Sequence, residues 1–208
     1  MAKVKICGVN AADALEAATE AGADWVGLVF YPPSPRALTP AQAASLHAAH
    51  PAGPPRVGLF VRPLDDEVEA ALEAVPLAAL QVYAEPERVA ALRKRFGLPV
   101  WHPIGIRSQV DLPRSLGGID ALLLEAQPPK GAALPGGNAL RFEWSLLRGW
   151  AAPGPWLLAG GLTPENVAEA IRTSGAPAVD VSSGVERARG VKDPALIRAF
   201  VHEARNAR

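Results

Sequence analysis

The chain has 208 residues with 21 basic and 21 acidic side chains, so its formal net charge is zero. This length suits one well-buried domain, and the balanced charge, without a basic stripe among aromatics, argues against nucleic acid as a partner. No apolar run approaches the roughly 18 residues of a membrane span, and the N-terminus lacks a signal-peptide pattern, so we expect a cytoplasmic protein with no membrane partner. The single cysteine, Cys7, excludes an intrachain disulfide.

Short apolar or β-branched runs alternate along the whole chain with Ala-, Glu-, Leu- and Arg-rich segments of helical period. We expect strands at 3–7, 24–29, 56–61, 78–83, 99–104, 119–124, 155–159 and 177–182. We expect helices at 11–21, 40–50, 65–74, 86–96, 108–116, 143–150, 164–173 and 193–205. Thr39 and Thr163 are expected to cap two of these helices, and Pro113 interrupts the fifth.

Strict alternation of strands and helices implies a parallel sheet with right-handed crossovers, either open or closed. Eight repeats favour closure, and no Gly-x-Gly-x-x-Gly follows the first strand, which counts against a dinucleotide-binding open sheet. The predicted fold class is therefore α/β, a single (β/α)8 TIM barrel over residues 1–208. The long connections at 31–38 and 126–141 then lie on the C-terminal face, where such barrels carry their chemistry.

Two adjacent strand ends near the C-terminus have the composition that holds a phosphate. The segment 158–164 stops at paired glycines before a helix, and 180–186 ends in serines and glycine. Glycine lets backbone N–H groups approach a phosphate closely, and a helix N-terminus adds its positive dipole end. Each segment alone is also consistent with a tight turn, but the pair matches the site that barrels build after strands 7 and 8. The predicted phosphate-binding residues are Gly160, Gly161, Ser182, Ser183 and Gly184.

Polar side chains at the C-terminal strand ends converge on one barrel mouth. They are Cys7, Arg36, Arg62, Gln81, Glu125, Asp180, Ser182 and Ser183. From this set we assign Arg36, Gln81 and Asp180, together with Lys5, to substrate binding. Nothing in the spacing of the four histidines forms a metal-ligand cluster, so no metal site is expected.

Cys7 ends the first strand immediately before Gly8. A lone cysteine is often a small core residue, but a thiol near a phosphate site and a positive charge can ionise and act as a base. Lys5 lies two residues earlier and therefore on the same side of the strand. Because strand 8 neighbours strand 1 in a closed barrel, we expect Lys5 to face Asp180 inside the barrel. The alternative is that both are solvated charges at strand edges.

Glu125 follows an apolar run on the sixth strand, roughly opposite the first. It is predicted as a general acid across the cavity from Cys7, which requires that burial raise its pKa. The alternative is an N-cap or loop carboxylate. Arg36 follows three prolines and could hold a carboxylate with its planar guanidinium group, although the residue alone is also typical of a surface arginine.

Together these segments resemble the phosphoribosylanthranilate isomerase family over essentially the whole chain. The segments that carry the resemblance are 5–8, 27–36, 56–61, 159–167 and 179–186 with Lys192 and Asp193. The Lys-Ile-Cys-Gly start is the specific part, because related phosphosugar barrels share the phosphate site but lack this start. The resemblance implies that Cys7 is the general base, that the acid lies at the end of strand 6, and that Arg36 binds the anthranilate carboxylate.

The resemblance also implies an Amadori rearrangement without a cofactor, on a small phosphosugar-anthranilate substrate in tryptophan biosynthesis. The chain departs from the family pattern in three places. Glu125 replaces an aspartate, Val82-Tyr83-Ala84 replaces Leu-His-Gly, and the segments 136–139 and 142–144 lack a glycine and an aspartate. One added methylene moves the carboxyl group by roughly 1.5 Å, so either the local backbone compensates or activity is reduced.

Two other interpretations stay open from the sequence: a different metal-free phosphosugar enzyme of the same fold, and a catalytically weak phosphosugar-binding protein. The 21 prolines and the single Met and Cys suit a thermophile, although GC-rich DNA gives a similar bias. As a macromolecular partner we allow for a second copy of the chain, a homodimer.

Overall fold

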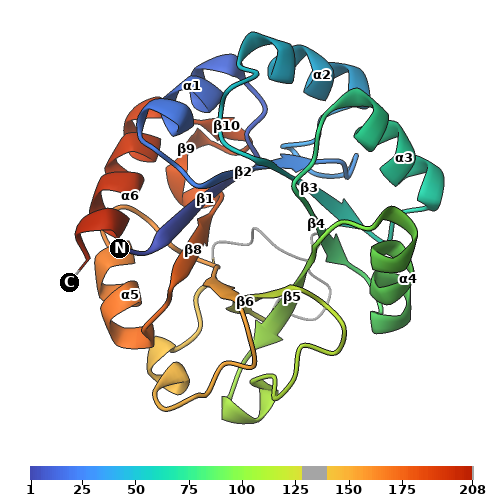
Figure 1. Cartoon of the computed structure of the whole chain (residues 1–208). Coiled ribbons are helices and arrows are strands. Elements are labelled where there is room, and N and C mark those ends of the chain that lie inside the picture. Colours follow the sequence, from blue (N-terminus) through green and yellow to red (C-terminus); the bar gives the residue numbers. More distant parts are fainter. Residues whose placement is uncertain (128–139, 208) are drawn as a thin grey trace.

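The computed structural model describes residues 1–127 and 140–207. Eight parallel strands close into a barrel in chain order, and β8 pairs with β1 (Figure 1). Their bounds are β1 Lys3–Cys7, β2 Trp25–Val29, β3 Arg56–Val61, β4 Ala79–Tyr83, β5 Val100–Ile106, β6 Ala121–Ala126, β7 Trp156–Leu158 and β8 Ala178–Val181. The predicted (β/α)8 architecture is confirmed.

Within residues 1–127 and 140–207, six α-helices surround this barrel. They are α1 Ala12–Glu20, α2 Pro40–Ala49, α3 Asp65–Ala74, α4 Pro86–Phe96, α5 Val167–Ser174 and α6 Pro194–Asn206. Thr39 caps α2 as predicted, since its hydroxyl accepts a hydrogen bond from Gln42 N at 3.2 Å. Thr163 does not cap α5, because that helix begins later, after Asn166, whose side chain closes the preceding turn.

Two of the eight predicted helices are absent from the described residues. The segment 108–116 forms only the 3₁₀ turn η1 (Gln109–Asp111), since Pro113 cannot continue a helix. The segment 143–150 forms the 3₁₀ turn η2 (Trp144–Leu147), which ends before Gly149 at φ +73°. One hairpin was not predicted: β9 (Glu186–Ala188) and β10 (Val191–Lys192) follow the 3₁₀ turn η3 (Ser183–Val185). Its sequence is polar and lacks the apolar alternation that marks a strand.

Apolar side chains fill the barrel near the ends where the strands begin. Trp25 and Trp101 meet edge to face with ring centroids 5.1 Å apart. Trp25 packs against a small inner cluster, which includes Trp101 and whose members lie on or next to six strands: Val57, Ala79, Trp101, Ala121, Leu123, Leu157, Ala159 and Ala178. A second, larger core lies between the barrel and the helices. The polar chemistry is therefore confined to the opposite end of the barrel.

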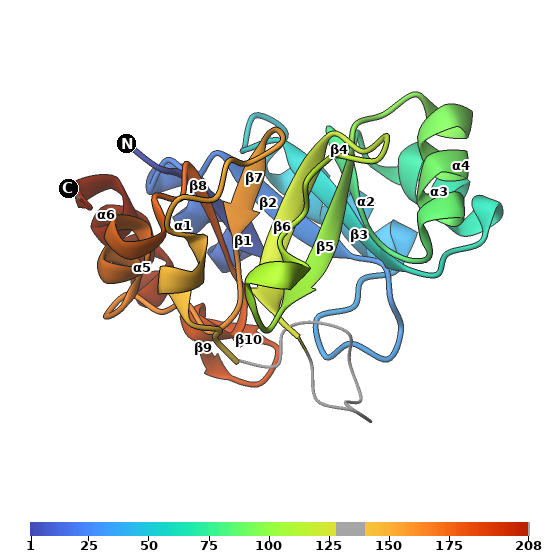
Figure 2. The same cartoon turned by 90° about the horizontal axis from the view of Figure 1, so that it is seen from below.

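At that opposite end, the β9 and β10 hairpin and the loop between β2 and α2 project from the barrel together (Figure 2). The contact between them is direct, because a Cβ on Gly190 would lie 2.5 Å from the backbone oxygen of Pro35. Two segments about 150 residues apart in sequence thus form one wall of the mouth.

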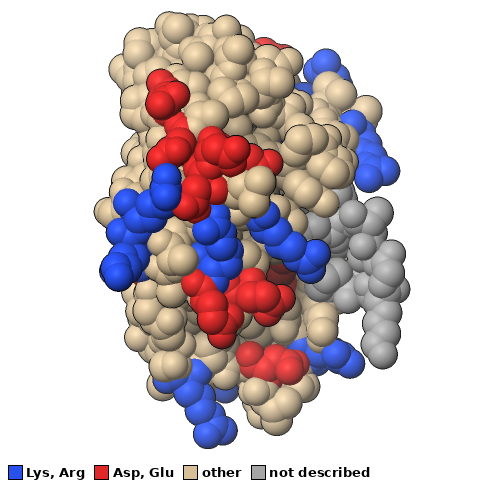
Figure 3. Space-filling view, turned by 90° about the vertical axis from the view of Figure 1, so that its right-hand side faces the viewer, with Lys and Arg blue, Asp and Glu red and all other residues tan. Residues whose placement is uncertain are grey.

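Acidic and basic side chains intermix on the outer face formed by α3 and α4 (Figure 3). Asp65 pairs with both Arg88 and Arg95, at 2.6 and 2.9 Å, and Arg93 pairs with Asp120 at 2.8 Å. Exposed pairs of this kind add little to stability. The mixture means that this face offers no continuous basic surface, in keeping with the zero net charge.

Candidate active site

Most of the predicted polar residues surround one cavity at the C-terminal mouth of the barrel, which is open to solvent and, with the open space at its mouth, about 730 Å³ in volume. The predicted site residues that line it are Cys7, Arg36, Gln81, Glu125, Gly160, Gly161, Asp180, Ser182, Ser183 and Gly184. Lys5 is the exception among the predicted site residues. It is fully buried and lies beneath the cavity, so it can act on a ligand only through its neighbours.

Lys5 and Asp180 occupy paired positions on β1 and β8, as closure of the barrel predicts. The Lys5 ammonium group donates to Asp180 Oδ1 at 2.7 Å and to Gln81 Oε1 at 2.9 Å. Burial alone would lower the pKa of Lys5, but Asp180 and Cys7 more than offset it and the pKa lies above its usual value. The two charges are therefore an internal pair rather than solvated strand-edge groups.

The Cys7 thiol and the Lys5 ammonium group share a space that only glycine leaves open. A Cβ on Gly27 of β2 would lie 2.9 Å from Sγ of Cys7 and 3.1 Å from Nζ of Lys5. Burial raises the pKa of the Cys7 thiol, and the Lys5 charge opposes that effect without overcoming it. In the ligand-free protein near neutral pH, Cys7 is therefore a protonated thiol.

Glu125 lies within β6, opposite Gly105 of β5, and only 7 % of its surface is exposed. Burial raises the pKa of its carboxyl group from 4.5 to about 8, although the interaction with the Tyr83 side chain acts in the other direction. The carboxyl group therefore keeps its proton near neutrality, as the prediction of a general acid required. Burial in the strand excludes the loop and N-cap alternatives.

Arg36 leaves the loop after β2 and is buried, not exposed. Its Nε and Nη2 donate to the two carboxylate oxygens of Glu186, at 2.6 and 3.0 Å. Gly8 makes room for this side chain, since a Cβ there would lie 2.5 Å from Cδ of Arg36, and its φ of +73° also favours glycine. In the Cys7-Gly8 pair, Cys7 thus supplies the thiol and Gly8 leaves space for the Arg36 side chain.

The two predicted phosphate-binding turns contact each other. Gly160 and Gly161 have φ of +85° and +64°, and a Cβ on either would press on the backbone of residues 140–141. A Cβ on Gly184 would overlap the backbone oxygen of Leu162. The turn after β8 therefore packs directly on the turn after β7, and glycine is needed for this approach.

A family model described as "N-(5'phosphoribosyl)anthranilate (PRA) isomerase" matches residues 4–203. The chain belongs to this family. A relative from Granulibacter bethesdensis is named N-(5'-phosphoribosyl)anthranilate isomerase. It is 54% identical over 208 residues, and the match covers 100% of both chains. Membership makes the chain an isomerase of tryptophan biosynthesis, as the resemblance implied.

Solved structures agree with this assignment. The phosphoribosyl anthranilate isomerase of Thermotoga maritima superposes with a TM-score of 0.85 at 34% identity, covering 99% of both chains. Another isomerase structure, in complex with reduced 1-(o-carboxyphenylamino)-1-deoxyribulose 5-phosphate, has a TM-score of 0.83 at 33% identity, again over 99% of both chains.

Two departures from the isomerase pattern lie in contact. Tyr83 on β4 stands at the place of the expected histidine, and its side chain interacts in the cavity with Glu125, which stands at the place of the expected aspartate. The third departure has two parts: residues 136–139 lie outside the described residues, whereas Glu143 caps η2 by accepting a hydrogen bond from Ser145 N at 3.4 Å. The site thus differs from the family pattern at two residues that interact with each other, Tyr83 and Glu125.

Sequence reasoning missed three side chains near the cavity: Tyr83, Glu186 and Lys192. In the sequence, Tyr83 stands out only as a departure from the family pattern, and Glu186 and Lys192 only as parts of the resemblance. Arg62, one of the candidate mouth residues, does not line the cavity; it is exposed, with a φ of +47°. In the described part of the chain, no group of three acidic, histidine or cysteine side chains could hold a metal ion, and no helix is long and apolar enough to cross a membrane.

Proposed function

We propose that the chain converts N-(5'-phosphoribosyl)anthranilate to 1-(2-carboxyphenylamino)-1-deoxyribulose 5-phosphate, with Glu125 as general acid and Cys7 as general base. Glu125 protonates the ribose ring oxygen, and the ring opens to a Schiff base. Cys7 then removes the C2′ proton, which gives an enolamine that relaxes to the aminoketone. The observation that carries this proposal is the buried Glu125 carboxyl group, whose pKa of about 8 keeps it protonated at the mouth that Cys7 shares.

To act as the base, Cys7 must be a thiolate, whereas in the ligand-free protein near neutral pH it is a protonated thiol. Burial raises the pKa of Cys7, so only the thiolate fraction of the enzyme is competent. Lys5 and Lys192 both favour that thiolate through their charges. Lys5 is therefore assigned an electrostatic role behind Cys7, with Asp180 and Gln81 holding its ammonium group in place.

Substrate binding divides between two anionic groups of the ligand. The backbone N–H groups around Gly160, Gly161, Ser182, Ser183 and Gly184 are assigned to the phosphate, because two glycine-rich turns meet there. Arg36 is assigned to the anthranilate carboxylate, since a guanidinium group is suited to a planar carboxylate. Gln81 and Asp180 also line the cavity and are assigned to the sugar hydroxyls.

One experiment tests this function against the two alternatives that the sequence left open. Freshly prepared phosphoribosylanthranilate is followed by fluorescence, with and without the protein. Rapid decay with the protein supports the proposal. Binding of the substrate without turnover would mark a phosphosugar-binding protein. A protein that binds the phosphate but does not turn over this substrate would be another phosphosugar enzyme. Unchanged turnover after exhaustive chelation is expected, because the mechanism uses no metal or other cofactor.

The remaining predictions from the sequence concern the whole protein. We infer a single barrel domain over residues 1–208, a cytoplasmic location, no membrane or nucleic-acid partner, and a homodimer. Limited proteolysis, cell fractionation and sedimentation equilibrium test the first, second and last of these. Thermophily is checked by the melting temperature, and a value within the ordinary mesophile range of about 45–65 °C would contradict it.

A further inference from the structure

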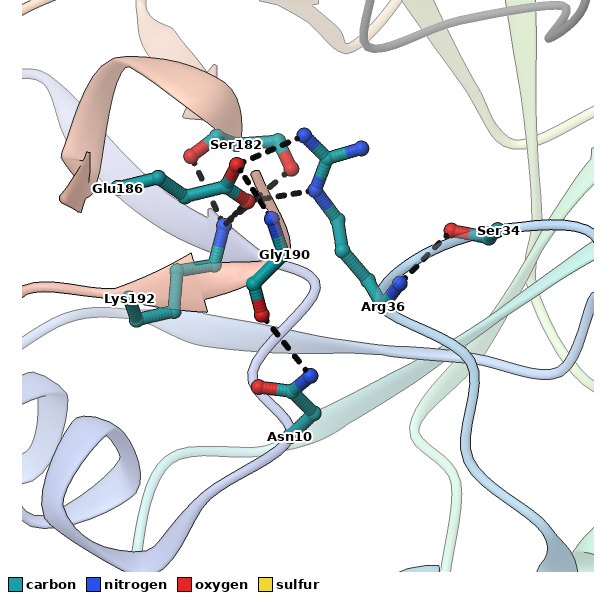
Figure 4. Close-up of polar contacts among 7 residues, drawn as sticks. All are labelled: Asn10, Ser34, Arg36, Ser182, Glu186, Gly190 and Lys192. Carbon is teal, nitrogen blue, oxygen red and sulfur yellow. Dashed lines mark hydrogen bonds and ion pairs between the residues drawn. The ribbon is translucent and has the colours of Figure 1, made fainter. Parts of the chain in front are cut away.

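A single buried carboxylate organises the cationic wall of the cavity (Figure 4). Glu186, at the start of β9, accepts hydrogen bonds from Arg36 Nε at 2.6 Å, Arg36 Nη2 at 3.0 Å, Lys192 Nζ at 3.0 Å and Gly190 N at 3.0 Å. Its side chain is only 4% exposed. Although burial by itself would raise the pKa of Glu186, the Arg36 and Lys192 contacts hold it below its usual value, so the group is an anion.

Lys192 extends this arrangement to the turn assigned to the phosphate. Its ammonium group, which is 1% exposed, also donates to the backbone oxygen of Ser182 at 2.8 Å and to Ser182 Oγ at 3.3 Å. Lys192 pairs with Glu186 in the β9 and β10 ladder. A continuous chain of contacts therefore runs from Arg36 through Glu186 and Lys192 to Ser182, across two separate loops.

The hairpin also fixes the arm that carries Arg36. Gly190 at its turn has φ +81° and packs on Pro35, and its backbone oxygen accepts a hydrogen bond from Asn10 Nδ2 at 3.1 Å. The backbone N of Arg36 donates to Ser34 Oγ at 3.2 Å. Loops from three different strands thus hold the arginine backbone, while Glu186 holds the guanidinium group.

We propose that Glu186 is a positioning residue, which aims the Arg36 guanidinium group at the substrate carboxylate and sets its distance from the phosphate turn. Within the described residues, this guanidinium group donates hydrogen bonds from Nε and Nη2, so Nη1 is left to donate to a ligand. The two cations around one carboxylate leave one net positive charge in a buried wall. This inference rests on the proposed function and adds the residue that makes the enzyme selective for a carboxylate-bearing phosphosugar.

If Glu186 acts by orienting Arg36, its loss should change ligand affinity in the opposite direction from the change expected if it acts only through its negative charge. If the carboxylate acts only through its charge, Glu186→Gln removes a negative group and should tighten the binding of an anionic ligand. If it positions Arg36, the same change should weaken that binding. Glu186→Asp keeps the charge but shortens the side chain, so only the positioning role predicts a defect in that variant.

The test measures two ligands by calorimetry on the full chain. One is reduced 1-(o-carboxyphenylamino)-1-deoxyribulose 5-phosphate, which carries both anionic groups, and the other is ribulose 5-phosphate, which lacks the carboxylate. For Glu186→Gln we expect at least a ~10-fold weaker affinity for the first, the loss typical of a charge-assisted hydrogen bond. Affinity for the second should fall by less than about threefold, and KM should rise more than kcat falls. Glu20→Gln, which breaks the exposed pair with Arg198, is the matched control.

A double-mutant cycle shows whether Glu186 acts through Arg36. In an Arg36→Met background, Glu186→Gln should have no further effect on the affinity for the carboxylate ligand. Unchanged or tighter binding by both Glu186 variants would overturn the proposal, as would an equal loss for both ligands, which would mark a general structural role. Failure of the wild type to turn over phosphoribosylanthranilate would instead count against the proposed function.

Discussion

The two sides of the cavity differ in how their charges are balanced. On the anion-binding side, Arg36 and Lys192 are already paired with Glu186, and every charge has a partner at hydrogen-bond distance. On the proton-transfer side, the pKa values of Cys7 and Glu125 both lie above their usual values, because burial outweighs their neighbours. The Glu186 carboxylate on the binding side is held as an anion, whereas the Cys7 thiol and the Glu125 carboxyl group are held in their protonated, uncharged forms.

The strongest way to break this contrast is to remove the base. Cys7→Ala should fold normally and keep its affinity for the reduced product analogue, while kcat falls by at least the ~10²-fold typical of a lost general base. Single-turnover kinetics measure the chemical step, and calorimetry measures the affinity. Near-normal turnover would remove Cys7 from the mechanism.

Removal of the acid should have a comparable effect. Glu125→Gln keeps the shape of the side chain but loses the transferable proton, so kcat should fall by about 10² while KM changes little. Glu125→Asp decides the geometry: because Tyr83 interacts with the longer side chain, we expect the aspartate variant to be slower than the wild type. A faster aspartate variant would show that the cavity keeps the usual family spacing, and full activity of Glu125→Gln would direct the search to Asp180.

The backbone of this site was predictable because it follows from periodicity. Closure of eight strands placed Lys5 opposite Asp180, and strand alternation placed Cys7 above Lys5, which the structure confirms. The predicted helices at 108–116 and 143–150 were wrong, because local proline and glycine outweigh a weak helical pattern there.

The contacts that the sequence did not predict depend on tertiary packing, which leaves no local pattern in the sequence. Glu186 reaches Lys192 through a short polar hairpin with a shifted register, and it reaches Arg36 across 150 residues. Tyr83 and Glu125 are separate departures in the sequence and become one pair only when β4 and β6 face the same cavity. Burial, which decides both pKa values on the proton-transfer side, is likewise a property of the folded barrel.

The pH dependence of the rate should separate the two sides. The active form needs the Cys7 thiolate and the protonated Glu125 together, yet the acid loses its proton at about pH 8, before the thiol does. Below pH 8, kcat/KM should rise up to ~10-fold per pH unit, then level off, and fall only above the pKa of Cys7. An optimum near pH 6.5 would contradict this order. The pKa of Glu186 lies below its usual value, so this carboxylate stays charged over the same range and should not contribute.

Loss of the paired arginine should affect binding more than chemistry. Arg36→Met removes a contact that substrate and transition state share, so KM should rise ~10-fold or more while kcat changes by less than about threefold. Arg198→Met, which removes an exposed arginine paired with Glu20, is the control. An unchanged KM would show that Arg36 serves Glu186 and not the substrate.

The smallest effect concerns stability and affects only the proton-transfer side. Burial raises the pKa of Glu125 from 4.5 to about 8, so the folded protein holds this proton more tightly than the unfolded chain does. The stabilisation that this group contributes is fully present below about pH 4.5 and is lost as the pH rises through 8. Its size is at most on the order of 5 kcal/mol.

The Glu125→Gln variant does not lose stability in this way, because its side chain does not ionise. Its melting temperature should therefore match the wild type near pH 4.5 and exceed it by several degrees at pH 9, whereas Glu20→Gln should show no such pH-dependent difference. Calorimetry across this range measures the difference, and equal melting temperatures at pH 9 would mean that Glu125 is ionised in the folded protein at neutral pH and unsuited to act as the acid.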